Sequence, residues 1–243
     1  MIRFEAVGKR YRNGREALSG VSLHVAPGEM VFLTGRSGAG KSTVLRLIAL
    51  LERPTRGDVV VGGQGTARLA ARKVPAYRRG IGVVFQDHRL LADRPVYDNV
   101  ALPLVVAHAP LREVDKRVRA ALDQVGLLGR ERALPGELSV GEQQRVGIAR
   151  AIISRPPLII ADEPTGNLDP QLAGEVFELF RRLNEVGVTV VVATHDIQRV
   201  RASGLREIAL ADGRVVGAHP GELPGLAAPG LAAPGAAAPA AGA

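Results

Sequence analysis

The stretch GRSGAGKS, residues 35–42, decides the fold of this 243-residue chain. It matches the pattern G-x-x-x-x-G-K-[ST], follows the apolar run MVFLT (30–34) and precedes the helical pattern KSTVLRLIALLE (41–52). A buried strand, a glycine-rich loop and a helix in this order predict a phosphate-binding loop, in which backbone N–H groups and the helix N-terminus surround the anion. Lys41 is expected to reach the β- and γ-phosphates, and the Ser42 hydroxyl to bind Mg²⁺.

Composition supports this reading of the loop and narrows the class of protein. Glycines are needed in such a loop because a Cβ would collide with the phosphate or demand forbidden dihedral angles. Lys41 is one of four lysines in a chain with 28 arginines, and a compact ammonium suits the site better than a planar guanidinium. The net charge of +8 could indicate nucleic acid, an anionic membrane surface or a generally basic proteome. It is attributed mainly to this preference for arginine, so no nucleic-acid partner is expected. The absence of cysteine excludes disulfides and thiolate metal sites.

Two further apolar runs predict the rest of the sheet. LIIA (158–161) and VTVVVAT (188–194) are typical of buried strands, and helical patterns lie between the runs. The helix predicted at 170–187 is well framed, with Asp169 as a possible N-cap and Pro170 in the first turn. Strands that alternate with helices predict a mostly parallel sheet in an α/β fold.

Three other segments complete the predicted organisation. The first 30 residues read as short strands joined by a turn, which predicts an N-terminal antiparallel β subdomain. Residues 90–155 are rich in helical patterns and contain no convincing strand, so a helical subdomain is expected to be inserted there. The domain is expected to span 1–220, with no signal peptide before it, and 221–243 to form a disordered Ala/Pro/Gly-rich tail. Frequent prolines make that tail a poor membrane span.

Polar residues that follow the buried strands are the candidate catalytic groups. Ligands of open α/β sheets bind beyond the carboxyl ends of the strands, where Asp162, Glu163 and His195 are placed. Asp162 is expected to support Mg²⁺, directly or through water, and Glu163 to orient or deprotonate the attacking water. His195 is expected to contact the γ-phosphate or to hold Glu163 and the water. The competing interpretation is that the two acids cap the next turn.

Gln86 and Tyr11 are weaker candidates from their positions alone. Gln86 ends the run IGVVFQ (81–86), where its amide can contact Mg²⁺ or the water, and spacing leaves this role and a structural one equally open. Tyr11, in an N-terminal turn, can either stack on the adenine ring or pack against the protein. A serine and a glycine in LSVGEQQR (138–145), which opens a helical stretch, resemble a second anion site.

Taken in chain order, the motifs resemble those of the nucleotide-binding subunits of ABC transporters over essentially residues 1–216. The matching motifs are GRSGAGKS, FQ, LSVGEQQR, LIIADEP, NLD and TH, at 35–42, 85–86, 138–145, 158–164, 167–169 and 194–195. DEPTGNLD with LSVGEQQR narrows the resemblance to a group that includes lipoprotein-release and macrolide-export ATPases. FQDHRLLADRPVYDNVALPL (85–104), MIRFEAVGKRY (1–11) and PGEMVFLTGRSGAGKST (27–43) are most similar to bacterial cell-division ATP-binding proteins.

The resemblance implies a P-loop fold of the ABC type and Mg²⁺-dependent ATP hydrolysis at the interface of a head-to-tail homodimer. One subunit would contribute the catalytic Lys41, Glu163 and His195 and the metal ligands Ser42, Gln86 and Asp162. The same subunit would bind the nucleotide through Tyr11, Gly35, Arg36, Ser37, Gly38, Ala39, Gly40, Lys41, Ser42, Thr43 and Gln86. The other subunit would contribute Ser139, Gly141 and Glu142, and residues 167–169 would line the dimer seam.

The resemblance also implies partners for the chain. Cell-division members of the family act with FtsX, a polytopic membrane protein, to control peptidoglycan hydrolases across the membrane. An FtsX-like partner, other division proteins and a position on the cytoplasmic face of the inner membrane are therefore expected. The coupling surface of the family lies near Gln86 and the helical subdomain.

The signature departs from the family pattern at one residue. Its third position is usually glycine and is Val140 here, and a β-branched residue excludes any dihedral angle that only glycine tolerates. If the Ser139 hydroxyl and the Gly141 N–H meet the γ-phosphate, Val140 points away without effect. Otherwise the dimer interface is weakened and hydrolysis is slow.

Three other functions compete with an ATPase of cell division. The membrane partner could belong to a lipoprotein or drug exporter, or the chain could be a nucleotide-gated scaffold whose hydrolysis is incidental. A DNA-repair or chromosome ATPase needs a long coiled coil or zinc insert between the phosphate loop and the signature. Fewer than a hundred residues separate Lys41 from Leu138, which argues against this third class.

Overall fold

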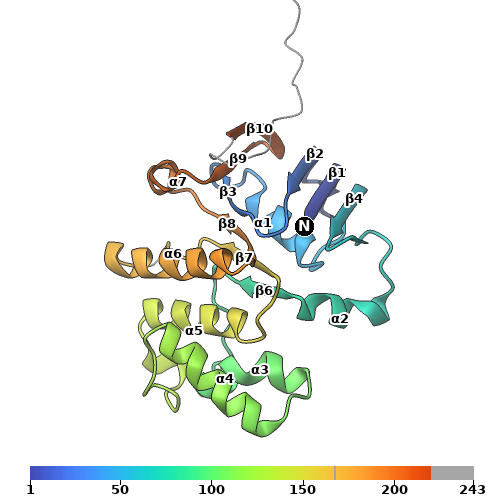
Figure 1. Ribbon diagram of the computed structural model, residues 1–243. Coiled ribbons are helices and arrows are strands. Elements are labelled where there is room, and N and C mark those ends of the chain that lie inside the picture. The colour runs from blue at the N-terminus through green and yellow to red at the C-terminus, as the bar shows by residue number, and fades with distance from the viewer. Residues whose placement is uncertain (167, 220–243) are drawn as a thin grey trace, which may run out of the picture.

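The computed structural model describes residues 1–166 and 168–219 and contains two sheets (Figure 1). The predicted tail at 221–243 and Asn167 of the predicted dimer seam lie outside the described residues. The larger sheet has six strands in the order β10-β9-β3-β8-β7-β6, and all neighbours are parallel except the edge pair β9 and β10. These strands are β3 (Met30–Thr34), β6 (Ile81–Val84), β7 (Leu158–Asp162), β8 (Thr189–Ala193), β9 (Arg206–Ala211) and β10 (Arg214–His219). The prediction of a mostly parallel core sheet is confirmed.

The second sheet is antiparallel and has the order β2-β1-β4-β5. Its strands are β1 (Ile2–Arg10), β2 (Glu16–Val25), β4 (Arg56–Val61) and β5 (Gln64–Gly65). The predicted antiparallel N-terminal sheet is confirmed, but β4 and β5 extend it with residues that lie beyond the phosphate loop. The helix α1 (Lys41–Ile48) is shorter than the pattern at 41–52 suggested, because Leu50 takes a left-handed φ of 52°.

Both faces of the central strands are covered, which explains their unbroken apolar runs. Val31 and Leu33 of β3 pack in a cluster with α1 and the antiparallel sheet. The alternate residue Phe32 packs in a second cluster with the helices on the other face, where its ring stacks on Phe177 at 5.8 Å between centroids. Successive side chains of a strand point to opposite faces, so a strand buried on both faces has no polar alternation.

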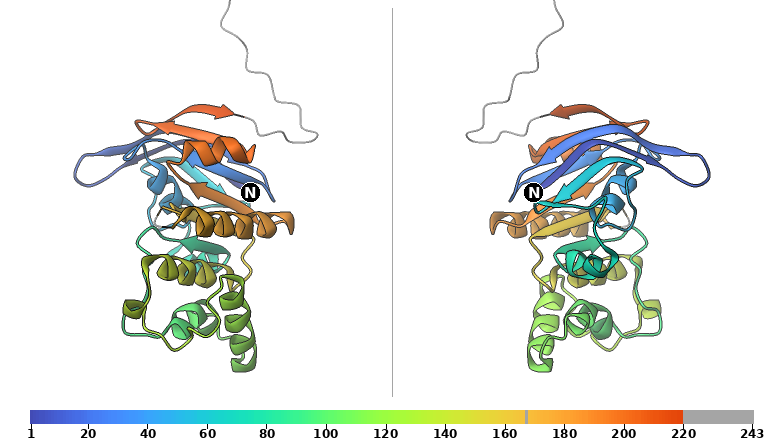
Figure 2. Two further views of the ribbon diagram at one scale, coloured as in Figure 1. Left: turned by 90° about the vertical axis from the view of Figure 1, so that its left-hand side faces the viewer. Right: turned by 90° about the vertical axis from the view of Figure 1, so that its right-hand side faces the viewer.

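The helices on this second face include a helical insert. Views from two sides show α3, α4 and α5 extending away from the sheets, beyond α6 (Figure 2). The helical insert is therefore confirmed as part of the fold. The bounds of these elements are α3 (Val96–Val106), α4 (Leu111–Gln124), η2 (Pro135–Glu137), α5 (Val140–Ile152) and α6 (Pro170–Glu185).

The remaining helices are η1 (Ala71–Lys73) and α2 (Val74–Arg79), which precede β6, and α7 (Ile197–Ser203), which follows β8. The predicted start of α6 is confirmed, since the Asp169 carboxylate accepts the backbone N–H of Gln171 at 3.0 Å. Across residues 1–166 and 168–219, the helices are all too short or too polar to cross a bilayer.

Candidate functional site

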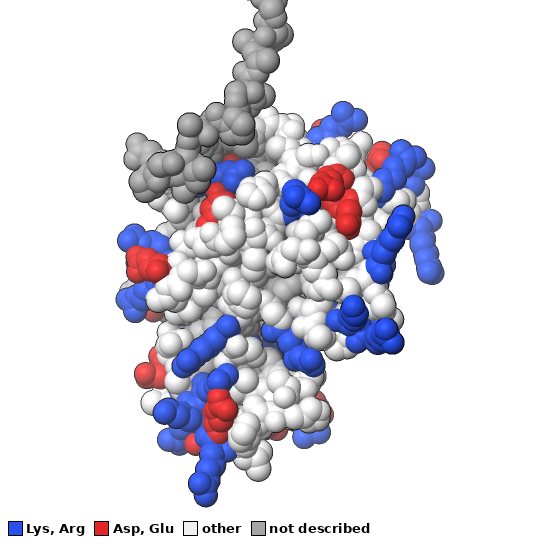
Figure 3. All heavy atoms as spheres, turned by 45° about the vertical axis from the view of Figure 1, so that its right-hand side comes forward, with Lys and Arg blue, Asp and Glu red and all other residues white. Residues whose placement is uncertain are grey.

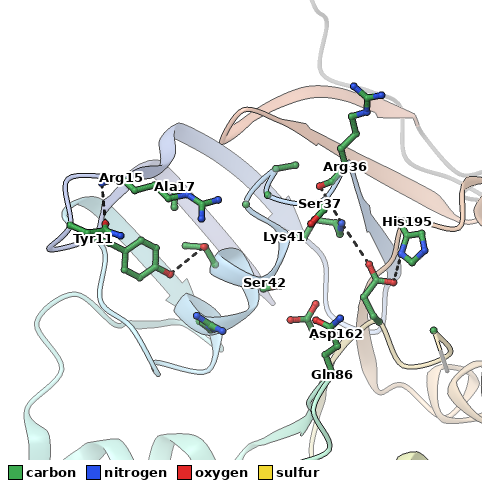
Figure 4. Close-up of a pocket in the computed structure, with 18 residues that line it drawn as sticks. Tyr11, Arg15, Ala17, Arg36, Ser37, Lys41, Ser42, Gln86, Asp162 and His195 are labelled. Atoms are coloured by element: carbon green, nitrogen blue, oxygen red, sulfur yellow. Dashed lines mark hydrogen bonds and ion pairs between the residues drawn. The ribbon is translucent and has the colours of Figure 1, made fainter. Parts of the chain in front are cut away.

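A cavity of about 860 Å³ opens at the carboxyl edge of the core sheet, where β3, β6, β7 and β8 end (Figure 4). It brings together most of the residues that the sequence assigned to one subunit, from segments far apart in the chain. The lining residues are Tyr11, Asn13, Arg15, Ala17, Arg36, Ser37, Gly38, Ala39, Gly40, Lys41, Ser42, Thr43, Arg46, Gln86, Asp162, Glu163, Gly166 and His195. Gly35 is not one of the lining residues, but its carbonyl oxygen accepts a hydrogen bond from Lys41 Nζ.

The glycines of the phosphate loop have a cause that the sequence did not reveal. Gly35 has φ 142°, and a Cβ on it would overlap the carbonyl oxygen of Leu210 in β9. A Cβ on Gly40 would lie 2.7 Å from Leu18 Cδ2 and 2.9 Å from the Ala17 carbonyl oxygen. The neighbouring strands therefore already exclude side chains here, in addition to any clash with a bound phosphate.

Lys41 is a buried cation at the centre of the loop. Its side chain is 8% exposed, and its Nζ donates to the Gly35 carbonyl oxygen at 2.7 Å. The nearest carboxylate oxygen, Glu163 Oε1, is 3.7 Å away (Figure 4). A buried ammonium beside the backbone N–H groups of a glycine-rich loop favours an anion in the space above it.

Glu163 is held by an unusual backbone conformation directly after β7. Its φ is 49°, in the left-handed region that costs a non-glycine residue about 1 kcal/mol or more. Its N–H donates to the Ala193 carbonyl oxygen at 2.9 Å, and its Oε2 lies 2.9 Å from His195 Nδ1. The Glu163 side chain is 13% exposed whereas that of His195 is 71% exposed. This geometry places a carboxylate between Lys41 and a histidine, which is suited to accepting a proton from water.

The residues expected to bind Mg²⁺ fit a divalent cation. Asp162 Oδ1 is buried without a hydrogen-bond partner in the described residues, and Ser42 lines the same cavity. Burial is the main cause that raises the pKa of Asp162, and the neighbouring Ser42 hydroxyl acts in the opposite direction. Gln86 lines the same cavity. Carboxylate, hydroxyl and amide oxygens are the ligands that Mg²⁺ prefers, and an orphaned buried oxygen is what such an ion would satisfy.

The far end of the cavity is formed by Tyr11 and its neighbours. The Tyr11 hydroxyl lies 3.3 Å from Thr43 Oγ1, and Lys9 Nζ lies 5.1 Å from the centre of the tyrosine ring. Lys9 is itself fixed by Glu52 at 2.7 Å. Arg15 points into the space between Tyr11 and the phosphate loop (Figure 4). The sequence analysis assigned no role to Lys9, which lies in the quoted stretch 1–11, or to Arg15, because neither residue carries a nucleotide-binding pattern.

The loop that carries Gln86 is tied to α5 by Arg150, which the sequence analysis also missed. Arg150 Nη2 donates to the His88 carbonyl oxygen at 2.5 Å and Nη1 to the Arg89 carbonyl oxygen at 2.7 Å. His88 and Arg89 have φ values of 55° and 49°, so two strained residues are held by one guanidinium. Burial lowers the pKa of Arg150. The spacing of 61 residues between Arg89 and Arg150 gives no sequence signal of this contact.

The signature residues lie outside the cavity of their own chain, at the start of α5. Ser139 is the N-cap, where its Oγ accepts the Glu142 N–H at 3.2 Å and donates to Glu142 Oε2 at 2.9 Å. Hydrogen bonds from Ser139 are the main cause that lowers the pKa of Glu142, and Arg130 also contacts this carboxylate at 3.0 Å. Gly141 lies beside Leu168, because a Cβ on Gly141 would be 3.1 Å from Leu168 Cδ2. Lys41 and the signature are thus not brought together within one chain.

Val140 occupies an ordinary helical position. It is the first residue of α5, it is not among the residues with positive φ, and 52% of it is exposed. The backbone here therefore requires no glycine. This favours the interpretation in which the Val140 side chain points away from the γ-phosphate of the dimer site.

Replacing Val140 with glycine is expected to change kcat for ATP by less than about twofold, because no glycine-only dihedral angle is relieved. The variant should lose up to about 1 kcal/mol of stability, since glycine is a poor helix former. The matched change Gly141→Val places a side chain against Leu168 and should reduce hydrolysis clearly. Steady-state ATPase assays and thermal unfolding check both variants, and a tenfold gain in kcat for Val140→Gly would contradict the expectation.

Comparisons with known proteins agree with this site. A protein-family model described as ABC transporter matches residues 18–166. The chain is 54% identical over 217 residues to the cell division ATP-binding protein FtsE of Escherichia coli (strain K12), covering 89% of this chain and 98% of that protein. It is 45% identical over 216 residues to the protein of the same name from Bacillus subtilis (strain 168), covering 89% and 95%.

Solved structures of related cassettes are similar throughout. The dimeric structure of a post-hydrolysis state of an ATP-binding cassette bound to ADP and Pi matches with a TM-score of 0.86 and 38% identity, covering 90% of this chain and 98% of that one. The dimeric structure of a bacterial ABC transporter cassette matches with the same TM-score and 39% identity, with the same coverage.

Proposed function

The chain belongs to the ABC transporter family of ATP-binding proteins, and from this membership we propose that it is the ATP-hydrolysing subunit of a membrane complex in bacterial cell division. Its ATP-binding domain spans 1–220. The observation that carries the hydrolytic part is the contact between Glu163 and His195 above the buried Lys41. The division role is supported by 54% identity over nearly the full length of a cell division protein.

The groups that line the cavity have different roles in ATP hydrolysis. The backbone N–H groups of the phosphate loop and Lys41 bind the phosphates, and Tyr11 stacks on the adenine ring. Glu163 accepts the proton of the attacking water, while His195 keeps the carboxylate oriented. Ser42, Asp162 and Gln86 would hold Mg²⁺, which when bound neutralises charge on the phosphate oxygens.

Each active site is completed by a second copy of the chain. Ser139 and Gly141 lie at a helix N-terminus outside the cavity of their own chain, and the Ser139 hydroxyl would exchange its hydrogen bond to Glu142 Oε2 for one to an anion. In a head-to-tail homodimer, this end of α5 faces the cavity of the partner subunit and meets the γ-phosphate. The proposal is supported by the dimeric form of the related cassette that matches over 90% of the chain.

A second concave surface is suited to the membrane partner. An apolar groove of about 880 Å³ runs between α2 and β6 on one side and α3 and α4 on the other. Leu51, Leu102 and Val106 expose 38%, 37% and 56% of their surface there, and Phe85, next to Gln86, also lines the groove. An apolar cytoplasmic helix of an FtsX-like polytopic protein fits this surface. Its docking would place the chain on the cytoplasmic face of the inner membrane and link the partner to the active site.

The double variant Leu102→Asp with Val106→Asp tests this assignment. Burying two carboxylates in an apolar interface costs free energy, so the variant should bind its membrane partner more weakly. In pull-downs from membranes, the amount of variant recovered with the FtsX-like protein should fall at least tenfold. ATP hydrolysis by the isolated chain should stay within about twofold, because neither residue touches the cavity. Val186→Asp is the matched control, since Val186 is 78% exposed and lies outside the groove. Unchanged recovery of the double variant would contradict the proposed docking site.

A further inference from the structure

One short segment of this protein contains basic residues and no acidic ones. Between Asp58 and Asp87 the sequence contains no acidic residue and five basic ones, so this segment carries five of the eight net positive charges. Four of the five basic residues are arginines, so the excess in this segment comes from the absence of acidic residues. We call the five residues the basic segment: Arg68, Arg72, Lys73, Arg78 and Arg79.

The charges of the basic segment are available to a partner. All five side chains are exposed, and no ion pair between described residues includes any of them. By contrast, Arg117 of α4, Arg130 of the loop before η2 and Arg181 of α6 each pair with a glutamate. Figure 3 turns the side of α2 towards the viewer and shows several basic side chains there with few acidic ones among them. Without neutralising neighbours, such charges act together on a surface within a Debye length.

Hydrogen bonds attach the segment to the C-terminal end of α1. The Tyr77 hydroxyl donates to the Ile48 carbonyl oxygen at 2.5 Å, and Arg78 Nη2 donates to the Leu50 carbonyl oxygen at 2.8 Å. These bonds satisfy carbonyl groups at the C-terminal end of α1 and just beyond it, where the helix supplies no partners. Arg78 is thus partly engaged within the protein, which leaves four free charges: Arg68, Arg72, Lys73 and Arg79.

The position of the segment identifies the kind of partner. Arg78 and Arg79 line the apolar groove together with Pro75, so this end of the basic segment forms one rim of that groove. If a membrane protein occupies the groove, as in the function proposed above, the rim lies next to the bilayer in which that protein is embedded. A single-stranded nucleic acid is a poorer fit, because the one aromatic ring between Arg68 and Arg79, that of Tyr77, is bonded to α1 rather than free to stack on a base.

We propose that the basic segment binds the anionic headgroups of the lipid bilayer beside the membrane partner. The inference rests on the proposed function for the orientation of the chain, while the binding itself depends only on the exposed charges. Each basic residue near an anionic membrane surface strengthens binding by about fivefold, so four free charges form a substantial second attachment. The protein partner and the lipid surface would then hold the cassette by two adjoining surfaces.

Sedimentation with vesicles tests the proposal with the full-length chain. At about 0.1 M salt, where charges within roughly 10 Å still interact, the wild type should bind vesicles that contain phosphatidylglycerol and not vesicles of phosphatidylcholine alone. The variant Arg68→Gln, Arg72→Gln, Lys73→Gln, Arg79→Gln should bind the anionic vesicles at least tenfold more weakly. Its ATP hydrolysis in solution should be unchanged, because none of the four residues lines the cavity.

A control variant with the same loss of charge separates the segment from the net charge of the protein. Arg181, Arg182, Arg201 and Arg214 are exposed residues of α6, α7 and β10, outside the groove, and their replacement by glutamine should alter vesicle binding less than twofold. Equal losses in both quadruple variants would overturn the proposal. It would also be overturned if the segment variant lost affinity for a single-stranded RNA and kept its affinity for vesicles.

Failure of the proposed function gives a different result. The variant Leu102→Asp with Val106→Asp should lose the membrane protein while it retains vesicle binding. If that variant kept its membrane partner, the docking site would be wrong, whereas the vesicle assay would still decide the lipid proposal.

Discussion

The variant Glu163→Gln is expected to lower kcat for ATP hydrolysis at least a thousandfold while ATP binding persists. Glutamine has the shape of glutamate, so the contact with His195 can remain, but an amide cannot accept the proton of the attacking water. The change also removes a negative charge 3.7 Å from Lys41, next to the expected position of the phosphates. ATP should therefore bind at least as tightly as in the wild type, and the ATP-bound dimer should accumulate.

Single-turnover hydrolysis, equilibrium binding of a fluorescent ATP analogue and size-exclusion chromatography measure these three effects. Glu178→Gln is the matched control, because Glu178 lies on α6 with a half-exposed side chain paired to Arg181. A Glu163→Gln variant that retains a tenth of the wild-type rate would contradict the role of Glu163. If hydrolysis is lost but the variant supports cell division fully, ATP binding alone is sufficient and the chain acts as a nucleotide-gated scaffold.

The variant Ser139→Arg is expected to abolish hydrolysis and to leave ATP binding by the monomer within about twofold. Ser139 is outside the cavity of its own chain, so the substitution cannot disturb the phosphate loop directly. In the dimer, however, a long side chain would enter the space that the γ-phosphate and the partner subunit occupy. Such an obstruction would remove the preorganised hydrogen-bond donors and would also prevent the dimer from closing. The rate of ATP hydrolysis should therefore fall a hundredfold or more.

Mixing experiments make this prediction specific to a shared site. Ser139→Arg and Lys41→Ala subunits are each inactive alone, but a mixed dimer contains one site with both an intact Lys41 and an intact Ser139. Part of the activity should therefore return on mixing, as a head-to-tail arrangement requires. Equal loss of ATP binding and hydrolysis in the Ser139→Arg variant would refute the assignment of Ser139 to the partner's site.

Much of this arrangement was predictable because it depends on local patterns. The unbroken apolar runs at 30–34, 158–161 and 188–194 identified the central strands, since a strand buried on both faces has no polar positions. The ends of those runs then located Asp162, Glu163 and His195 on one edge of the sheet. The N-cap at Asp169 was equally local, because its partners are two and three residues away.

Contacts between distant segments were not predictable from these patterns. The pairing of β1 with β4 joins strands on either side of the phosphate loop, and neither strand encodes its partner. Arg150 was one arginine among 28 until the fold placed it against the carbonyl groups of His88 and Arg89. The basic side chains of the segment are likewise unpaired among the described residues because the fold keeps the acidic residues of other segments away from them.

A phosphate loop, a mostly parallel sheet and two acids at its carboxyl edge follow from the amino-acid sequence alone. Spacing along a strand or helix fixes such features, because they arise from neighbours in the chain. Only the folded structure shows that Gly35 is required by the Leu210 carbonyl group and that Arg150 holds the carbonyl groups of His88 and Arg89. Each of these features is a contact between segments that are distant in the sequence. The segments meet only when the chain folds and buries both faces of the sheet.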